Sequence, residues 1–450
     1  MAIEALPGPD PADDGDTGLD PRDWVAFRSL AHRMLDDSLD HIAGRRDQPV
    51  WRPMPDAVRS GFDGPLPRAA EGLEAAYDDF RRTVVPYSMG NDHPRFWGWY
   101  MGPGNPVGNL ADLLASVLNP NLGGADHAPV LVEQQVVRWC AEAAGYPASA
   151  SGLLVSGASE ANLVGLAVAR TARIGPEVRT DGLRGDRRYA VYASSEVHSC
   201  HRKSVELLGL GESSLRIVPV RPDFTMDVDA LAAAVAADRA DGIQPLAVVA
   251  TVGTINTGSV DDVEAIADLA EREGLWLHVD GAIGGFLALS SQPGAVRGLA
   301  RADSLALDLH KWMQAPIDVG LALVRDEAAH RATFSVVPTT CSTPPAAWRQ
   351  VTCGSTSTAS PSHGASEPSG SGWRSRPTAP TPSAGSWTAT SRRRAGSPTW
   401  STRTPSSSAS RRWAATWSAC ATRPRRSRPS GSTRSTRRSC CACTRAGSRS

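Results

Sequence analysis

The chain has very little lysine and no long apolar segment. Lys203 and Lys311 are the only lysines among its 450 residues, although arginine is frequent. No run of about 18 apolar residues occurs, which argues against a membrane-spanning helix. The acidic, Pro-rich start MAIEALPGPDPADDGD differs from a secretory signal peptide. These absences predict a soluble cytoplasmic protein with no membrane partner, long enough for two or three domains.

Cysteine and acidic residues are also unevenly distributed. Residues 1–340 contain only Cys140 and Cys200, which suits a reducing compartment, and they carry a net charge of −17. Residues 341–450 contain 18 arginines and six cysteines, with Glu367 as the only acidic residue, so their net charge is +17. We do not interpret the six cysteines as a disulfide framework.

Residues 340–450 are predicted to be a low-complexity basic tail. They contain no Leu, Ile, Met, Phe, Tyr, Lys or Asn, and Val351 is their only valine. Such a segment cannot bury enough apolar side chain to offset the entropy of ordering it. A nucleic-acid-binding tail is one interpretation, because clustered arginines neutralise phosphates. The abrupt change of composition favours the other, a frameshift in a GC-rich gene, so nucleic acid is not the partner that we expect.

The rest of the chain divides into three predicted segments. Residues 1–20 are expected to be disordered, residues 21–88 to form an N-terminal helical arm, and residues 89–339 to form one large domain. In the arm, helices are predicted over 22–46 and 69–82. In the large domain, helices are predicted over 109–118, 130–146, 160–173, 199–208, 227–241 and 261–273. Strands are predicted over 153–155, 189–193, 246–251, 275–279, 304–307 and 320–324.

This alternation indicates the fold class and the place of the site. Continuously apolar strands separated by helices are typical of an α/β fold, with a mostly parallel sheet covered by helices on both faces. Ligands of such sheets bind at the carboxyl ends of the strands.

Two predicted strand ends carry groups suited to an anionic, aromatic ligand. The turn from Ser156 to Ser159 leads into a helix, where free N–H groups and the Ser159 hydroxyl would hold a phosphate. Taken alone, an ordinary helix start with Glu160 in its first turn explains it more simply. Asp280 ends another strand, and a buried carboxylate requires a cation or hydrogen bonds. A protonated pyridine nitrogen would supply that cation, and capping of the next turn is the alternative.

Lysine and histidine residues follow further strand ends. Lys311 precedes Trp312 and Met313, whose apolar side chains would exclude water and favour an imine-forming amine, although a surface lysine is the alternative. His198 could lie flat on an aromatic cofactor; the alternative is that His198 and His201 form a helix-start pair facing solvent, which is the interpretation that we favour for His201. His127 lies in a loop, where it contacts substrate or solvates the turn. The shared position of these groups at strand ends favours one joint site, without a metal.

Six segments resemble, in chain order, the motifs of group II pyridoxal-phosphate-dependent amino-acid decarboxylases: HPRFWGWYMGPGNP, LADLLASVLNPNLGG, SGASEANLVGLAVAR, VYASSEVHSCHRKS, HVDGAIGG and LDLHKW. That family includes the aromatic-L-amino-acid, tyrosine, histidine and glutamate decarboxylases. The resemblance extends from about residue 25 to residue 338. It implies fold type I and a homodimer with active sites at the subunit interface. It also implies decarboxylation of an L-amino acid, with aromatic amino acids as candidates, to the amine and carbon dioxide through a Schiff base on Lys311.

The resemblance also implies a role for each matched residue. Lys311 would hold pyridoxal phosphate, Asp280 would pair with its ring nitrogen and His198 would stack on its ring. The remaining cofactor-binding residues would be Ala158, Ser159, Thr254, Ala282, Asp308 and His310. The substrate pocket would be shaped by Phe96, Trp97 and Trp99, with His127 as a further candidate.

One departure and several alternatives remain. The family's C-terminal domain, with its catalytic tyrosine, should follow Pro338, but no tyrosine occurs after that position, so an inactive frameshifted protein is an alternative. An aminotransferase or a carbon–carbon lyase would use the same lysine, aspartate and phosphate-binding turn. A dinucleotide-binding site is disfavoured, because GPGNPVG does not follow a strand and lacks the required glycine spacing.

Overall fold

The computed structural model describes residues 20–122 and 127–335 of the chain. The predicted basic tail and, apart from Asp20, the predicted disordered start therefore lie outside the described residues. Within the two described ranges, every helix is too short or too polar to cross a membrane.

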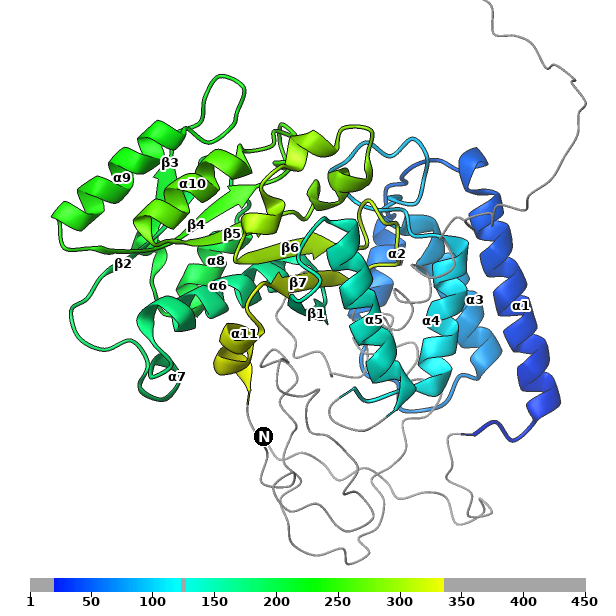
Figure 1. Ribbon diagram of the computed structural model, residues 1–450. Helices are drawn as coiled ribbons and strands as arrows, with labels where there is room; N and C mark the ends of the chain where they lie inside the picture. The colour runs from blue at the N-terminus through cyan, green and yellow to red at the C-terminus, as the bar shows by residue number, and fades with distance from the viewer. Residues whose placement is uncertain (1–19, 123–126, 336–450) are drawn as a thin grey trace, which may run out of the picture.

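A seven-stranded sheet forms the centre of the large domain (Figure 1). Its strand order is β1-β7-β6-β5-β4-β2-β3, and only β7 runs antiparallel to its neighbours. The strands are β1 (Ser151–Val155), β2 (Tyr189–Ser194), β3 (Leu215–Val218), β4 (Gln244–Thr251), β5 (Trp276–Asp280), β6 (Ser304–Asp308) and β7 (Gly320–Val324). The prediction of a mostly parallel sheet is confirmed, and the six strands other than β7 end at the same edge.

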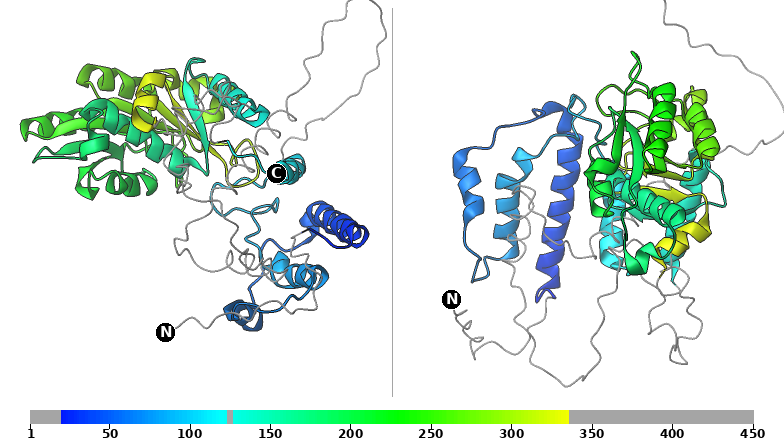
Figure 2. Two further views of the ribbon diagram at one scale, coloured as in Figure 1. Left: turned by 90° about the horizontal axis from the view of Figure 1, so that it is seen from below. Right: turned by 90° about the vertical axis from the view of Figure 1, so that its left-hand side faces the viewer.

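Helices cover both faces of the sheet (Figures 1 and 2). One face packs against α6 (Ala158–Ile174), α8 (Cys200–Leu207) and α11 (Glu327–Phe334). The other packs against α5 (Ala128–Ala143), α9 (Val228–Ala240) and α10 (Val263–Glu273). Because successive side chains of a strand point to opposite faces, β4 supplies Val249 to the first layer and Val248 to the second.

The helical arm stands at one end of this sheet domain (Figure 2). It contains α1 (Trp24–Ala43), α2 (Asp56–Ser60) and α3 (Leu73–Thr83), and α4 (Pro106–Leu118) lies beside them. Tyr77 on α3 donates a hydrogen bond to Asp37 on α1 at 2.9 Å, which joins the two helices. The short α7 spans Val178–Asp181, and 3₁₀ turns span Arg45–Asp47, Gly61–Asp63, Val85–Tyr87, Glu212–Ser214, Gly285–Leu289, Pro293–Val296 and Leu299–Arg301.

Short polar side chains determine where several helices begin. Asp23 accepts hydrogen bonds from the first free N–H groups of α1, and Asn105 caps α4 in the same way. Asp227, Asp262 and Asp326 do so for α9, α10 and α11. Such caps satisfy donors that have no partner within the helix.

Besides the short helices α2 and α7, two elements were not predicted from the sequence, β3 and α11. The edge strand β3 has only four residues, and its Ile217 is half exposed, so it lacks the continuous apolar pattern of the inner strands. Helix α11 has only eight residues, and its buried positions include His330 and Thr333 rather than an apolar stripe. Both elements depend on tertiary packing more than on local pattern.

Helix α6 lies unusually close to the sheet at Gly165. A Cβ atom added there would come within 2.5 Å of the His278 ring on β5 and 3.1 Å of the Ser304 hydroxyl on β6. The absence of a side chain therefore sets the distance between α6 and the strands that carry the polar residues described below.

We predict that Gly165→Ala destabilises the protein by about 1–2 kcal/mol. Alanine favours a helix by about 1 kcal/mol over glycine, but overpacking costs about 1–3 kcal/mol and outweighs that gain. Urea unfolding of the full chain measures the difference. Gly61→Ala is the matched control, since nothing lies within 4 Å of a Cβ atom at that position. A Gly165→Ala protein as stable as the wild type would contradict the prediction.

Candidate active site

The loop after β6 places Lys311 at the carboxyl edge of the sheet. Its Nζ lies 2.9 Å from Oδ2 of Asp308, the last residue of the strand. The other carboxylate oxygen of Asp308 accepts a hydrogen bond from the Ala158 N–H at the start of α6, at 2.6 Å. One buried carboxylate thus joins the lysine to the helix N-terminus.

The surroundings of Lys311 differ from the expected apolar ones. Trp312 and Met313 are exposed, by 56% and 37%, and the charged Asp308 contacts the amine instead. His310 is half-buried, and its Nδ1 lies 2.9 Å from the Val319 carbonyl oxygen. The strand end therefore provides an ion pair rather than a water-free apolar pocket.

The turn before α6 has features both of an ordinary helix start and of a phosphate-binding turn. Glu160 accepts hydrogen bonds from the Ser156 N–H at 3.0 Å and from the Ser156 hydroxyl at 2.9 Å, as a helix-capping residue does. Ser159 is exposed in the first turn, and the helix N-terminus faces the edge where Lys311 lies. A positive helix end with an exposed hydroxyl suits a phosphate.

Asp280 ends the adjacent strand β5 and is only 5% exposed. Its Oδ2 accepts hydrogen bonds from His201 Nε2 and Asn162 Nδ2, both at 3.0 Å. Its Oδ1 accepts the Ala282 N–H at 3.1 Å. The cation expected beside this carboxylate is therefore supplied by a histidine of the chain itself.

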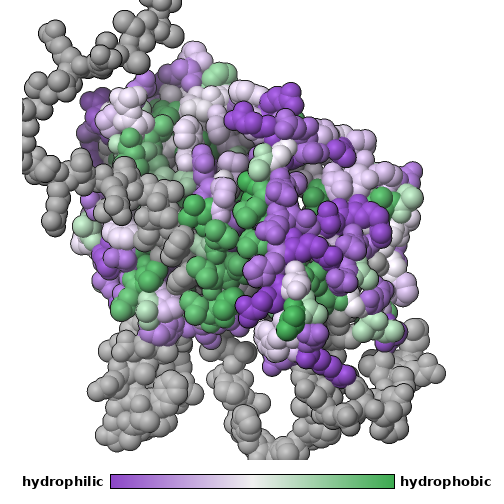
Figure 3. All heavy atoms as spheres, turned by 90° about the vertical axis from the view of Figure 1, so that its right-hand side faces the viewer, coloured by the Kyte–Doolittle hydropathy of each residue, from purple (hydrophilic) through white to green (hydrophobic). Residues whose placement is uncertain are grey.

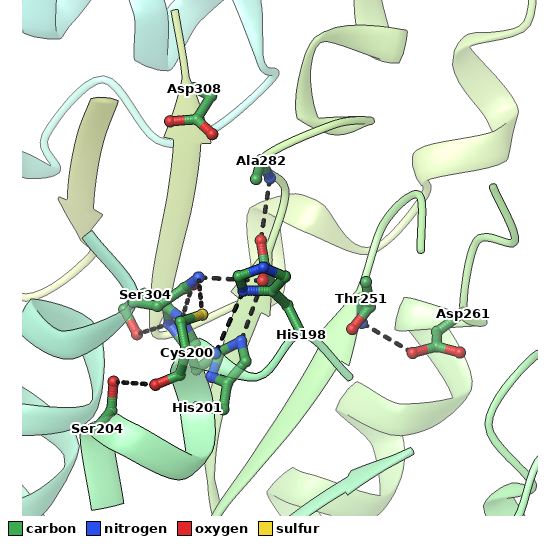
Figure 4. A network of polar contacts seen from close by, with 12 residues as sticks. His198, Cys200, His201, Ser204, Thr251, Asp261, Ala282, Ser304 and Asp308 are labelled. Carbon is green, nitrogen blue, oxygen red and sulfur yellow. Dashed lines mark hydrogen bonds and ion pairs between the residues drawn. The ribbon is translucent and has the colours of Figure 1, made fainter. Parts of the chain in front are cut away.

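The prediction that His201 faces solvent was wrong. Its side chain is completely buried, between α8 and β5, and its Nε2 lies 3.0 Å from Asp280 Oδ2. Figure 4 shows His201 beside Cys200. Because α8 begins at Cys200, one turn at its start brings both Cys200 and His201 against the sheet. Ligand-type atoms of Cys200, His201 and Asp280 all lie within 4.8 Å of one another.

The polar contacts continue beneath Asp280 toward β6. Oδ1 of Asn162 lies 2.8 Å from His278 Nε2, and His278 Nδ1 lies 2.8 Å from the Ser304 hydroxyl. Trp276 Nε1 donates to the same hydroxyl at 2.8 Å. We call His201, Asp280, Asn162, His278 and Ser304 the buried polar chain.

The buried polar chain shifts the proton affinity of its members in opposite directions. Burial alone would raise the pKa of Asp280, but the hydrogen bond and charge of His201 hold it far below its usual range. Burial would likewise lower the pKa of His201, yet hydrogen bonds to Asp280 and Cys200 raise it to about 10. For His278, burial and the nearby charge of His201 lower the pKa to about 3. His201 is therefore the charged imidazole and His278 the neutral one.

His198, Cys200 and Thr251 line the same strand ends (Figure 4). His198 is half-buried, and a hydrogen bond with Cys200 raises its pKa. Burial would raise the pKa of the Cys200 thiol, but hydrogen bonds with His198 and His201 lower it to about 6. Thr251 is opposite Asp280 in the register of β4 and β5, and its buried hydroxyl has no hydrogen-bond partner among the described residues.

Several candidates from the sequence stand apart from this cluster. The Thr254 hydroxyl lies 2.5 Å from the Thr257 hydroxyl and accepts a hydrogen bond from the Ser259 N–H, so both of its contacts lie within its own turn. His127 Nε2 lies 2.9 Å from the Asn121 carbonyl oxygen, beside the start of α5.

The segment 96–102, which contains the aromatic candidates, approaches the loop of Lys311 through the backbone of Gly102. Gly102 packs so closely on the His310 carbonyl that a Cβ atom has no room there. Trp97 and Trp99 are 93% and 69% exposed, and Phe96 is partly exposed. The described residues therefore leave these three side chains outside any closed pocket.

The sequence analysis missed four residues of the buried polar chain and its surroundings: Asn162, Thr251, His278 and Ser304. A signal existed for two of them. His278 precedes Asp280 by two positions, so both point to the same face of the strand. Asn162 is a polar residue in an otherwise apolar and small-residue helix face.

Comparisons with known proteins agree with this geometry. Residues 55–341 match the profile described as "Pyridoxal-dependent decarboxylase conserved domain". An aromatic-L-amino-acid decarboxylase of Bacillus atrophaeus is 33% identical over 69% of this chain and 64% of its own length. An L-2,4-diaminobutyrate decarboxylase of Rhizobium meliloti (strain 1021) is 35% identical over 59% of this chain and 52% of its own length. The chain thus spans less than two thirds of either relative.

Solved structures give the same result. The Oryza sativa TDC structure with PLP and tryptamine has a TM-score of 0.67 and 27% identity, covering 75% of this chain and 71% of that one. The mouse CSAD structure has a TM-score of 0.64 and 28% identity, covering 70% and 68%. The expected fold type I and the resemblance found in the sequence are confirmed: the chain belongs to the family of pyridoxal-dependent decarboxylases.

Proposed function

We propose that the protein binds pyridoxal 5'-phosphate and decarboxylates an L-amino acid to its amine and carbon dioxide. The observation that carries this proposal is the common edge of the sheet. Lys311, Asp280, His198 and the N-terminus of α6 all lie at strand ends there, on neighbouring elements. Membership of the decarboxylase family supports this reaction over transamination or carbon–carbon cleavage.

The side chains present fit this cofactor. Lys311 supplies a primary amine, and the N-terminus of α6 with the exposed Ser159 hydroxyl suits a phosphate. Within the described residues, Ala282 is the only donor to Oδ1 of Asp280, so this oxygen has capacity for a ring N–H. The unpartnered Thr251 hydroxyl on the adjacent strand offers one more polar contact.

The chemistry divides between the cofactor and the chain. Bound pyridoxal phosphate supplies an electron-withdrawing ring that accepts the electrons of the breaking Cα–carboxylate bond. The Asp280 carboxylate would pair with the ring nitrogen and keep it protonated, and His198 would orient the ring. Lys311 must lose a proton at Nζ before it acts as a nucleophile. Oδ2 of Asp308 lies 2.9 Å from Nζ and is a candidate acceptor of that proton.

We propose an aromatic or bulky substrate side chain. Phe96, Trp97 and Trp99 precede Gly102, which packs on the backbone next to Lys311. An aromatic-L-amino-acid decarboxylase is among the similar proteins. Aromatic substrates should therefore react faster than glutamate.

We further propose that the enzyme is a homodimer in the cytoplasm. Helices α1, α3 and α4 line an apolar groove of about 590 Å³, and the face that contains it is rich in exposed apolar residues (Figure 3). Leu39, Leu73, Leu110 and Leu113, which line the groove, are 42–53% exposed. Exposed apolar surface of this kind is typical of an interface, and a second copy of the chain is the partner that family membership favours. The free thiols of Cys140 and Cys200 support a reducing compartment.

We predict that Lys311→Ala abolishes covalent capture of pyridoxal phosphate, because only that lysine lies at the strand ends. Borohydride reduction of the full chain with the cofactor, followed by peptide mass spectrometry, measures the adduct. Lys203→Ala is the matched control, since it removes the only other lysine and should leave the adduct in place. An adduct that survives Lys311→Ala at undiminished yield would rule out this lysine as the cofactor site.

Product analysis then tests the reaction itself. The loaded protein should convert an aromatic L-amino acid to the amine with release of carbon dioxide. A keto acid product would instead show transamination. Capture without any turnover would support the inactive alternative.

The dimer is tested by placing a charge on the apolar face. Leu113→Glu should shift the full chain from dimer to monomer in sedimentation velocity, because a buried unpaired carboxylate is costly. Leu207→Glu is the control: Leu207 is also exposed, at 69%, but lies on α8 of the large domain. A Leu113→Glu protein that remains dimeric would exclude this face.

A further inference from the structure

Asp280 has a charged partner of its own behind the strand end. His201 Nε2 lies 3.0 Å from Oδ2, the oxygen that also accepts Asn162 Nδ2, while Oδ1 accepts the Ala282 N–H. The two carboxylate oxygens are therefore unequal. The side chains of α6 and α8 satisfy one oxygen, and the other retains capacity for a further donor.

His201 is isolated from water, and the acids that stabilise its charge are Asp280 and the Cys200 thiol. Its side chain has no exposed surface, and its Nδ1 has no hydrogen-bond partner among the described residues. The titratable groups that face it are Asp280 and His278 on β5, Cys200 beside it on α8, and His198 just before that helix. The His278 ring is 6.0 Å away, edge to face.

We propose that His201 is a positioning residue that keeps Asp280 ionised and fixed before the cofactor arrives. This inference rests on the proposed function and adds to it a residue that does not touch the cofactor. An imidazolium at Oδ2 replaces the solvation that burial removes, so the carboxylate needs no ligand to remain charged. A ring N–H then meets a carboxylate that is already oriented.

The direction of the pH effect follows from the charges. Removing the His201 charge raises the pKa of Asp280, because burial is then less opposed. Asp280 should therefore become protonated at a higher pH, and the neutral acid lacks the negative charge that would pair with a protonated ring nitrogen. Consequently, the pH below which cofactor affinity falls, here called the acid limb, should move to a higher value by about 1–3 units.

The test compares cofactor affinity from pH 3 to 8 in the full chain. His201→Gln keeps a donor without the charge, and His201→Leu removes both. We expect the acid limb to move upward in both variants, with weaker affinity in the leucine variant. His330→Gln is the matched control, because His330 is equally buried but its partner is the neutral Ser151 hydroxyl. It should leave the limb where it is in the wild type.

The apo protein provides a second, independent readout. The raised pKa of His201 gives stability that is complete below its ordinary value of 6.5 and is lost as pH rises toward about 10. The depressed pKa of Asp280 gives stability that is present above its ordinary value of 3.8 and is lost as pH falls below it. The stability lost in His201→Gln, measured by urea unfolding, should therefore be largest between about pH 4 and 6.5 and shrink toward pH 10.

The outcomes separate this inference from the proposed function. A wild type that captures no cofactor on Lys311 refutes the proposed function, and the apo unfolding series still decides the role of His201. An acid limb that stays in place in both variants, with a stability loss that does not change with pH, overturns the inference. If His201→Leu fails to fold, His201→Gln decides alone.

Discussion

The buried charge of Asp280 is the constraint on which the site depends. A carboxylate that is almost completely removed from water is unstable unless cations and donors replace the water. Here β5 supplies the carboxylate, α6 supplies Asn162, and α8 supplies His201. These three elements must therefore keep their positions for the charge to be tolerated, and Gly165 permits the short distance between α6 and the sheet that this requires.

Helix α6 connects the two halves of the site. Its first residue, Ala158, donates to Asp308 on β6, and one turn later Asn162 donates to Asp280 on β5. The helix thus fixes at the same time the carboxylate beside the lysine and the carboxylate that we propose to pair with the ring nitrogen. Asn162 interrupts the apolar stripe of α6, yet the helix is buried there. The Asn162 side chain is tolerated because its amide hydrogen-bonds both Asp280 and His278.

The sequence predicted the sheet well because its inner strands are buried on both faces and therefore continuously apolar. It predicted the ends of those strands, and with them Asp280 and Lys311, for the same reason. It could not predict His201, since a helix start near two histidines resembles a solvated one until α8 is packed against β5. The prediction that apolar side chains surround Lys311 was wrong for a similar reason. Trp312 and Met313, its neighbours in sequence, face solvent, whereas Asp308, three positions earlier, contacts the amine.

Cofactor capture and turnover make different demands on this chain. The groups proposed to hold pyridoxal phosphate lie between Ala158 and Lys311, inside the range that matches the family, and the sheet and its helices already bring them to one edge. Turnover requires in addition a closed pocket that excludes water around the reacting carbon. Trp97 and Trp99, which we propose to shape this pocket, are exposed among the described residues. The second copy of the chain that we propose for the apolar face would be one source of a surface that covers them.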